Sequence, residues 1–340
     1  MMHSFDRYLV TGATGFLGKV LIRKLASAGA SVRALVLEND PASDALPSGV
    51  QRIAGDVADP TSLDTFFSGD LSHACVIHCA GLISIATRKD PRLWHVNADG
   101  TKHVMAHCLR TRPERVVCVS SVHAIPERPK GQIICEVDSF SPPLVRGQYA
   151  KSKAAGAQYA LDAAREGLSV SVVHPSGIIG PFDDKRGSIT STILSFCNRR
   201  LPLAVHGGYD FVDVRDVADG ILACAERGRA GEGYILSGRY VTLKEIFAIL
   251  KRAGYGAEPH YLPLWFVRLN AVWMELDSLV HRKPLFLTPY SAYTLGSNAC
   301  FSYEKAAREL GYCPRPLEET LFDMVRWLKR EGALPAPVGA

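Results

Sequence analysis

The stretch Thr11-Gly12-Ala13-Thr14-Gly15-Phe16-Leu17-Gly18 decides the fold. It directly follows the short apolar run Tyr8 to Val10, which we interpret as a strand, and it opens the segment Phe16 to Ala28, which has the apolar spacing of a helix. Glycines in such a turn allow a sharp bend and a close approach to a phosphate, whose charge the N-terminus of the helix stabilises. A strand, a glycine-rich turn and a helix in this order predict a dinucleotide-binding fold.

The first half of the chain repeats this alternation of short apolar runs and helix-length segments. Further strands are predicted at Val32 to Leu37, Val76 to His78, Val116 to Val119 and Val170 to Val173, and further helices at Arg92 to Leu109 and Tyr149 to Ala164. Strands that alternate with helices predict an α/β fold, a doubly wound parallel sheet with helices on both faces.

The pattern changes after His174, where prolines and glycines interrupt the chain before a predicted helix at Ile189 to Asn198. We expect the chain to leave the sheet there for a smaller, mostly C-terminal substrate lobe, and to return to the sheet with residues 211–225 and 234–236. The predicted dinucleotide-binding domain is therefore 1–175 and 206–240, and the predicted lobe is 176–205 and 241–334. The tail 335–340 is predicted to be disordered.

Composition excludes several classes of function. The net charge of +5 is spread along the chain without a basic stripe, which argues against a nucleic-acid partner. No apolar stretch is long enough to span a bilayer, and the charged Asp6 and Arg7 precede the first apolar run, so we expect a cytoplasmic protein without an export signal. The nine cysteines lack paired spacing, which predicts neither a disulfide framework nor a metal site.

Three residues have the arrangement of a proton relay. Tyr149 and Lys153 are four residues apart in a predicted helix, so they share one face, and a nearby ammonium would stabilise the phenolate of a tyrosine. Ser121 follows a strand at the edge where open α/β sheets bind ligands, and its hydroxyl could bond a carbonyl oxygen. A serine after a strand is also a common loop cap, but the Tyr149 and Lys153 pair favours catalysis. We leave His123 out of the catalytic set, because a lone imidazole in a loop is more often solvated or capping.

The order of the motifs resembles that of one enzyme family. They are the GxxGxxG spacing from Gly12 to Gly18, Gly55-Asp56-Val57, His78-Cys79-Ala80-Gly81, Val96-Asn97-Ala98-Asp99-Gly100-Thr101, Val119-Ser120-Ser121, Tyr149 to Lys153, His174 to Pro181 and Phe211 to Ala218. The chain resembles the extended short-chain dehydrogenase/reductases, also called the NAD-dependent epimerase/dehydratase family. Within the family, the sequence of Val32 to Val36 is similar to that of the dihydroflavonol reductase and 3β-hydroxysteroid dehydrogenase branch.

The resemblance implies a nicotinamide cofactor and the residues that hold it. These are Gly12, Thr14, Gly15, Phe16, Leu17, Gly18, Leu37, Glu38, Asp56, Val57, Cys79, Ala80, Gly81, Asn97, Val119, Tyr149, Lys153, His174, Pro175, Ser176 and Ile178. We expect NAD over NADP, because Leu37 stands where relatives that use NADP often have arginine and Glu38 would repel a 2′-phosphate. The aspartate typical of NAD users is missing, since Val36 takes its place, so NADP stays open.

The resemblance also predicts the reaction. We expect hydride transfer between the nicotinamide and a small-molecule substrate, a ketone, aldehyde or secondary alcohol with a hydrophobic, steroid-like or flavonoid-like body. The apolar segments Tyr261 to Val267 and Leu285 to Tyr290 suit a ring system. The alternatives are a nucleotide-sugar epimerase with bound NAD and a non-catalytic cofactor-binding regulator. Candidate cations for a sugar diphosphate are Lys185, Arg186, Arg199, Arg200, Arg215 and Arg282, and a homodimer stays open.

Overall fold

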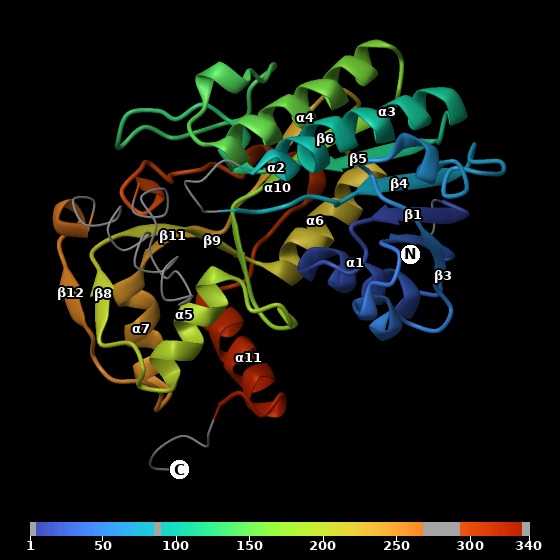
Figure 1. The fold of residues 1–340 in the computed structure, drawn as a ribbon. Helices are drawn as coiled ribbons and strands as arrows, with labels where there is room; N and C mark the ends of the chain where they lie inside the picture. The colour runs from blue at the N-terminus through green and yellow to red at the C-terminus, as the bar shows by residue number, and fades with distance from the viewer. Residues whose placement is uncertain (1–4, 85–89, 268–292, 335–340) are drawn as a thin grey trace.

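The computed structural model describes residues 5–84, 90–267 and 293–334. A parallel sheet of seven strands, in the order β10-β6-β5-β4-β1-β2-β3, forms the centre of the described part (Figure 1). The strands are β1 (Arg7–Thr11), β2 (Val32–Val36), β3 (Gln51–Ala54), β4 (Ala74–His78), β5 (Arg115–Val119), β6 (Val170–Pro175) and β10 (Gly233–Leu236). The direction of strand order reverses between β1 and β4, where open α/β sheets bind ligands.

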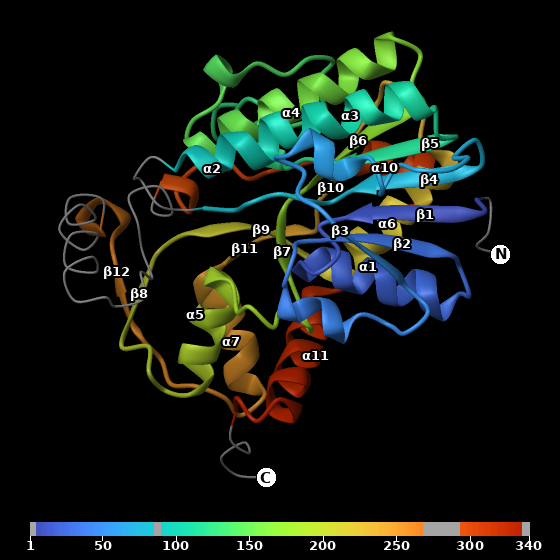
Figure 2. The same cartoon turned by 45° about the vertical axis from the view of Figure 1, so that its right-hand side comes forward.

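Helices cover both faces of this sheet. The helices α1 (Phe16–Ser27) and α6 (Val214–Arg227) pack on one face, and α3 (Gly100–Thr111) and α4 (Gln148–Arg165) pack on the other (Figure 2). Successive residues of β1 belong to opposite cores, since Leu9 packs with the α3 and α4 side while Tyr8 and Val10 pack with the α1 side. The predicted doubly wound fold is confirmed.

Two local features differ from the prediction. The predicted helix at Arg92 to Leu109 is interrupted, because α2 (Pro91–Trp94) continues into a π-helical turn, η3 (His95–Asp99), before α3 begins. The strand β3 was missed, because the exposed Gln51 and Arg52 give this edge strand no apolar run. Short 3-10 helices are η1 (Pro41–Ala45), η2 (Pro60–Leu63), η4 (Val122–Ala124) and η5 (Pro142–Leu144).

The remaining elements build a smaller lobe beside the carboxyl edge of the sheet (Figure 2). It contains the three-stranded sheet β11-β9-β7 and the two-stranded sheet β12-β8. The bounds are β7 (Gly177–Ile179), α5 (Ser188–Cys197), β8 (Leu203–Val205), β9 (Gly208–Asp213), β11 (Arg239–Thr242), α7 (Leu243–Arg252), β12 (His260–Leu262) and α11 (Leu317–Arg330), while α10 (Glu304–Leu310) packs against α6 and β10.

The segment 211–225 divides between the two parts of the molecule. Its first residues lie in β9 of the small sheet, and the others form α6 on the central sheet. The predicted domain boundaries stay a prediction. The predicted disordered tail 335–340 lies outside the described residues.

Aromatic stacking forms the centre of the lobe. Phe196 of α5 and Phe247 of α7 are both buried, and their rings stack at a centroid distance of 4.3 Å and an interplanar angle of 10°. A capping box of Thr242 and Glu245 fixes the start of α7, because each side chain bonds the other residue's backbone N–H.

We expect Phe247→Ala to lower the free energy of unfolding by about 3–5 kcal/mol, because it leaves a cavity against Phe196. Urea denaturation of the full chain measures the change. The matched control is Phe322→Ala on α11, whose side chain is 37% exposed, with an expected change of about 1 kcal/mol or less. Equal losses in the two variants would contradict the proposed core.

Candidate functional site

The turn between β1 and α1 is built on glycines that leave no room for a side chain. Gly12 has φ +67°, and a Cβ there would lie 2.6 Å from the backbone nitrogen of Ala80, beyond the end of β4. A Cβ on Gly18 would lie 2.1 Å from the carbonyl oxygen of Gly12. Because α1 begins at Phe16, the N–H groups of its first turn face this tight loop and form a site suited to a pyrophosphate.

A series of hydrogen bonds, in which each donor and acceptor can be assigned, lies next to this loop. The Ala80 N–H donates to Thr11 Oγ1 at 3.2 Å, and Thr11 Oγ1 lies 2.8 Å from His78 Nδ1. On the other side of the ring, His78 Nε2 lies 3.0 Å from Thr101 Oγ1, whose own hydroxyl donates to the Asn97 carbonyl at 2.8 Å. Thr101 must therefore accept from His78 Nε2–H, and Nδ1 accepts from Thr11.

The charge state of His78 agrees with this assignment. Burial lowers the pKa of His78 to about 3, so the ring is neutral and carries one proton. The hydrogen bonds through Thr11, His78 and Thr101 connect the glycine-rich loop to the π-helical turn around Asn97. The buried, neutral His78 thus has a structural role below the glycine-rich loop.

Asn97 fixes the segment that follows β4. Its Oδ1 accepts from the Leu82 N–H at 2.8 Å, and its Nδ2 donates to the Leu82 carbonyl at 2.9 Å and to Ser152 Oγ at 3.0 Å. A Cβ on Gly81 would lie 2.9 Å from Lys153 Nζ and 3.2 Å from Asn97 Oδ1. Glycine at position 81 therefore leaves the space that the lysine head group fills.

The structure brings Ser121, Tyr149 and Lys153 to the carboxyl edge of β5. Tyr149 and Lys153 both belong to α4 and are buried, and Lys153 Nζ donates to the Val119 carbonyl at 3.0 Å. Ser121 Oγ accepts from the backbone N–H of His123 at 3.2 Å, so its own proton is left to donate.

Burial dominates the titration of these groups. Burial raises the pKa of Tyr149, and a hydrogen bond with the Ser121 hydroxyl opposes that rise. Burial also lowers the pKa of the Lys153 ammonium. Both shifts disfavour the charged form, as expected for groups removed from water.

A histidine at the end of β6 holds the backbone of Ser121 in place. His174 is buried, and burial lowers its pKa to about 4, so the neutral ring donates Nδ1–H to the Ser121 carbonyl at 3.2 Å. Pro175 ends β6, Ser176 connects it to β7, and the half-buried Ile178 lies in β7.

The residues predicted to hold the adenosine lie at the ends of β2 and β3. Leu37 and Glu38 are exposed directly after β2, and Leu37 has 54% of its surface accessible. Asp56 Oδ1 accepts from the Ala58 N–H at 2.9 Å, and Val57 packs against Gly100 at the start of α3. This end of the site is more open than the end around Lys153.

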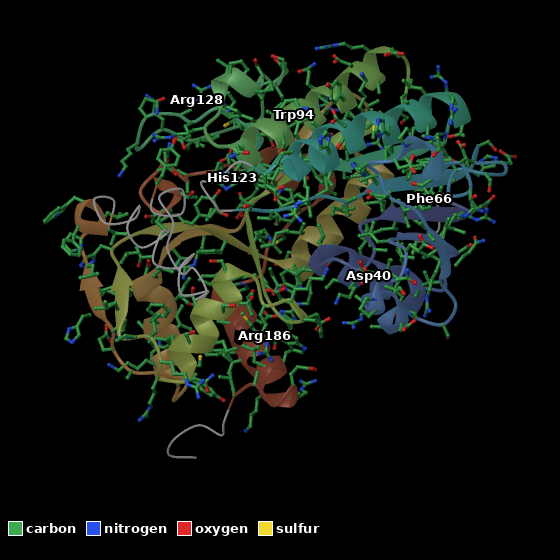
Figure 3. All side chains as sticks on the ribbon, in the orientation of Figure 1. Asp40, Phe66, Trp94, His123, Arg128 and Arg186 are labelled. Carbon is green, nitrogen blue, oxygen red and sulfur yellow. The ribbon has the colours of Figure 1, made fainter. Side chains whose placement is uncertain are left out.

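Sequence reasoning missed two charged residues near the glycine-rich loop. A hydrogen bond with the Thr14 side chain is the largest cause of the lowered pKa of Asp40. Buried Lys19 pairs with Asp184, which connects α1 to the loop before α5. Figure 3 shows Asp40 beside α1. It also shows Arg186, one of the candidate cations for a sugar diphosphate, on the small lobe. Asp40 precedes a proline and reads as a turn residue in the sequence, so no local signal marks it.

A cavity of about 230 Å³ lies next to His123, whose ring packs edge-on against the Tyr149 ring. Apolar side chains form much of its wall, and polar groups contribute the rest. The lining residues are Val122, His123, Ile125, Glu127, Ile134, Pro143, Leu144, Val145, Arg146, Ala150, Tyr209, Tyr293, Thr294, Ser297, Asn298 and Phe301. Ser121, Tyr149 and Lys153 are not among these residues, and the cavity is connected to the predicted relay through the contact of the His123 ring with the Tyr149 ring.

The aromatic segment Tyr261 to Val267, singled out in the sequence, does not line this cavity. Trp265 and Phe266 are 64% and 43% exposed, and the segment Tyr261 to Val267 supplies none of the lining residues. The segment Leu285 to Tyr290 and Arg282 lie outside the described residues. Asn298 contributes to the wall, and its Nδ2 group lies within hydrogen-bonding distance of three carbonyls of the loop from Arg128 to Gln132, which share its two protons.

Comparison with known proteins identifies the family. The model of the NAD dependent epimerase/dehydratase family matches residues 8–237. The chain belongs to this family. A Synechocystis sp. protein named "Putative dihydroflavonol 4-reductase" is 33% identical over 96% of this chain and 96% of that protein.

Two further relatives match the chain over nearly its whole length. The 4-hydroxy-2-methyl-3-oxo-4-farnesyl-3,4-dihydroquinoline-1-oxide ketoreductase of Stigmatella aurantiaca is 30% identical over 97% of this chain and 99% of that protein. The crystal structure of gox2253 superposes with a TM-score of 0.83 at 30% identity, covering 97% of this chain and 100% of that chain. The chain is thus similar to named reductases within a family of NAD-dependent enzymes, the extended short-chain dehydrogenase/reductases.

Within 5–84, 90–267 and 293–334, no group of three or more histidines, cysteines or acids could hold a metal ion. The same residues contain no helix that is long and apolar enough to cross a membrane.

We expect Gly81→Ala to lower kcat/KM at least about tenfold, because the added methyl group displaces Lys153 Nζ, and small misplacements in active sites cost at least this much. Steady-state kinetics with the best carbonyl substrate measures the loss. The matched control is Gly49→Ala, where a Cβ meets no atom within 4 Å. Full activity of Gly81→Ala would show that the position of Lys153 is unimportant.

Proposed function

We propose that the protein reduces a ketone, or oxidises the corresponding secondary alcohol, with NAD(H) as cofactor. The observation that carries the proposal is the contact between the Tyr149 ring and the ring of His123, which lines the cavity. A substrate in the cavity would extend its carbonyl group to the buried phenol of Tyr149 and the hydroxyl of Ser121, with the buried Lys153 ammonium one helical turn away.

The glycine-rich loop fits the proposed cofactor. Side chains at positions 12, 18 and 81 would clash with the Ala80 backbone, the Gly12 carbonyl and the Lys153 head group. Glycines therefore allow the tight turn that brings the N-terminus of α1 to where a pyrophosphate would bind. The loop from Gly12 to Gly18 would hold the pyrophosphate, and Leu37, Glu38, Asp56 and Val57 the adenosine. Cys79, Ala80, Gly81, Asn97, Val119 and Lys153 would hold the nicotinamide ribose, and His174, Pro175, Ser176 and Ile178 the nicotinamide.

The proposed mechanism assigns one task to each residue of the relay. Bound NADH supplies the hydride that reduces the carbonyl carbon. Tyr149 donates its proton to the carbonyl oxygen, and Ser121 donates a hydrogen bond to the same oxygen as charge develops there. The Lys153 ammonium stabilises the resulting phenolate, which offsets the burial that raises the pKa of Tyr149. In the oxidation direction the same proton returns to Tyr149.

Three observations support an apolar ketone over a nucleotide sugar. Ile125, Ile134 and Phe301 line the cavity. Arg215, one of the candidate cations for a diphosphate, is already paired with Asp213 and Asp323. The Stigmatella relative is named for a ketone with a farnesyl chain and a hydroxyl at the neighbouring ring position. We therefore propose a hydrophobic ketone or secondary alcohol as substrate.

A panel of steroids, flavonoid-type ketones, aldehydes and uridine-diphosphate sugars tests this function, with nicotinamide absorbance and thermal shift as readouts. We expect turnover and stabilisation with hydrophobic ketones. Conversion of the nucleotide sugar alone would replace the proposal by an epimerase. Cofactor binding without turnover of any class would replace it by a regulator.

We expect Tyr149→Phe to lower kcat at least about a hundredfold while the Kd of NADH changes little, because the variant removes one proton donor and little volume. Lys153→Met should lower both activity and NADH affinity. Stopped-flow kinetics and fluorescence titration measure the two quantities. Activity of Tyr149→Phe within a few-fold of the parent would refute the relay, and unchanged NADH affinity in Lys153→Met would remove its contact with the ribose.

We also propose that the enzyme prefers NADH to NADPH, because the carboxylate of Glu38, exposed directly after β2, would repel a 2′-phosphate bound there. The double variant Leu37→Arg/Glu38→Ser should raise NADPH affinity about tenfold, since a guanidinium pairs with a phosphate where a carboxylate repelled it. The control is Leu203→Arg, which adds the same charge at an exposed residue of β8. NADPH binding at least about tenfold tighter than NADH in the parent enzyme would overturn the preference.

A further inference from the structure

The loop between β7 and α5 lies against the N-terminal part of α1, close to the glycine-rich loop (Figure 1, Figure 2). We call residues 181–187 of this loop the strap. Lys19 of α1 pairs with Asp184 of the strap, and one turn further along α1 the Arg23 guanidinium lies over the Phe182 ring, 5.3 Å from its centroid. The small lobe is thus attached to the helix whose N-terminus forms the proposed pyrophosphate site.

The strap is a structured part of the small lobe. The Asp183 carboxylate accepts from the Gly187 N–H at 2.8 Å and from the Thr190 hydroxyl of α5 at 2.6 Å. The Phe182 ring packs edge-on against the Trp327 ring of α11 at a centroid distance of 6.3 Å. These contacts fix the strap to α5 and α11, so its position relative to α1 depends on the lobe.

The backbone of the strap is strained. Phe182 has φ +78° and Arg186 has φ +49°, in the left-handed region that residues other than glycine seldom adopt. Such a conformation persists only where contacts with the surroundings maintain it. The contacts of the strap with Lys19 and Arg23 are of this kind. Because the strain opposes the observed conformation, the loss of one of these contacts favours a strap that moves away from α1.

A third element meets the strap near Thr14 of the glycine-rich loop. A hydrogen bond with Thr14 is the largest cause of the lowered pKa of Asp40, and the charges of Lys185 and Lys19 add smaller contributions. Asp40 belongs to the loop after β2 and Lys185 to the strap. The strap, α1 and the loop after β2 therefore approach one another around Thr14, and each has a charged group that attracts a neighbour.

The pair of Lys19 with Asp184 is the contact best suited to hold the strap. Only 5% of the Lys19 side chain is exposed, compared with 47% of the Asp184 side chain. A buried ammonium without a partner is strongly destabilising, because its charge has been removed from water. Asp184 supplies that partner from the small lobe. A pair with one buried member is also screened less by salt than a pair on the surface.

We propose that the Lys19–Asp184 pair is a latch that keeps the strap over the bound cofactor and slows cofactor exchange. The inference goes beyond ketone reduction, and it rests on the proposed position of the pyrophosphate at the glycine-rich loop. Lys19 and Asp184 are positioning residues, which hold the strap and take no part in the chemical step. A cofactor bound between the glycine-rich loop and the strap leaves only after this pair has separated.

The rate of cofactor release tests the latch. The complex with NADH is mixed with excess NAD⁺ in a stopped-flow instrument, and the loss of NADH fluorescence gives koff. NADPH and NADP⁺ replace them if NADPH binds the parent more tightly. We expect Lys19→Met and Asp184→Asn each to raise koff at least about fivefold, because a partly buried pair contributes more than an exposed one. The double variant should release the cofactor as fast as Lys19→Met alone, since the two residues act as one pair.

The variant Asp184→Asn separates a latch from a direct contact between Lys19 and the cofactor. If Lys19 bound the pyrophosphate itself, removal of the competing Asp184 carboxylate would free the ammonium for the phosphate and lower koff. The latch predicts the opposite sign. Because separation of the pair also eases cofactor entry, the Kd should rise less than koff in both single variants.

The pair of Lys24 with Asp219 provides the matched control. Lys24 Nζ lies 2.7 Å from Asp219 Oδ1, and the Asp219 side chain is 47% exposed, as that of Asp184 is. This second pair joins α1 to α6, on the same face of the central sheet, and not to the lobe. Lys24→Met and Asp219→Asn should therefore keep koff within about twofold of the parent value.

The outcomes separate the latch from the function on which it rests. An equal rise of koff in the latch and control variants, or a koff in Asp184→Asn that is unchanged or lower, would overturn the latch and leave the proposed reductase standing. If the parent binds neither NADH nor NADPH, the proposed cofactor site is wrong together with the latch.

Discussion

The close approach of β1, β4 and α4 at one edge of the sheet is the constraint on which the site depends. Gly12 touches the backbone of Ala80, and Gly81 leaves room for the head group of Lys153. Any side chain at either glycine would separate the strands or displace the ammonium. The cofactor loop and the proposed relay are therefore parts of a single packing arrangement, in which backbone contact replaces side-chain contact.

Neutral buried histidines maintain this arrangement. His78 bridges Thr11 and Thr101 below the glycine-rich loop, and His174 holds the carbonyl of Ser121. An imidazole has one donor and one acceptor on opposite sides of a rigid ring, so it can bridge two elements at a fixed distance. Protonation would abolish the acceptor, and burial prevents it by lowering the pKa of both rings. Strong desolvation is useful here because it preserves a single tautomer.

Sequence alone predicted the parts of the molecule that depend on local patterns. The glycine spacing from Gly12 to Gly18, the apolar runs and the four-residue spacing of Tyr149 and Lys153 each follow from the geometry of one strand, turn or helix. The π-helical turn around Asn97 was not predictable, because one extra residue in a helical turn barely alters the apolar periodicity. The edge strand β3 was missed for a related reason, since it buries no side chain fully.

The cavity could not be predicted from the sequence, because its wall comes from distant parts of the chain. Ile125, Tyr209 and Phe301 meet only after the small lobe has folded back along the sheet, and a bridge from Ile134 to Phe301 closes one side. The apolar sequence of Tyr261 to Val267 suggests a substrate-binding surface, yet Trp265 is largely exposed and does not line the cavity. His123 shows the converse, because a lone loop histidine has no local signal, and its environment comes from Tyr209, a residue 86 positions away. Residues whose surroundings come from distant parts of the chain are thus the least predictable, since no local pattern reports where the folded chain places them.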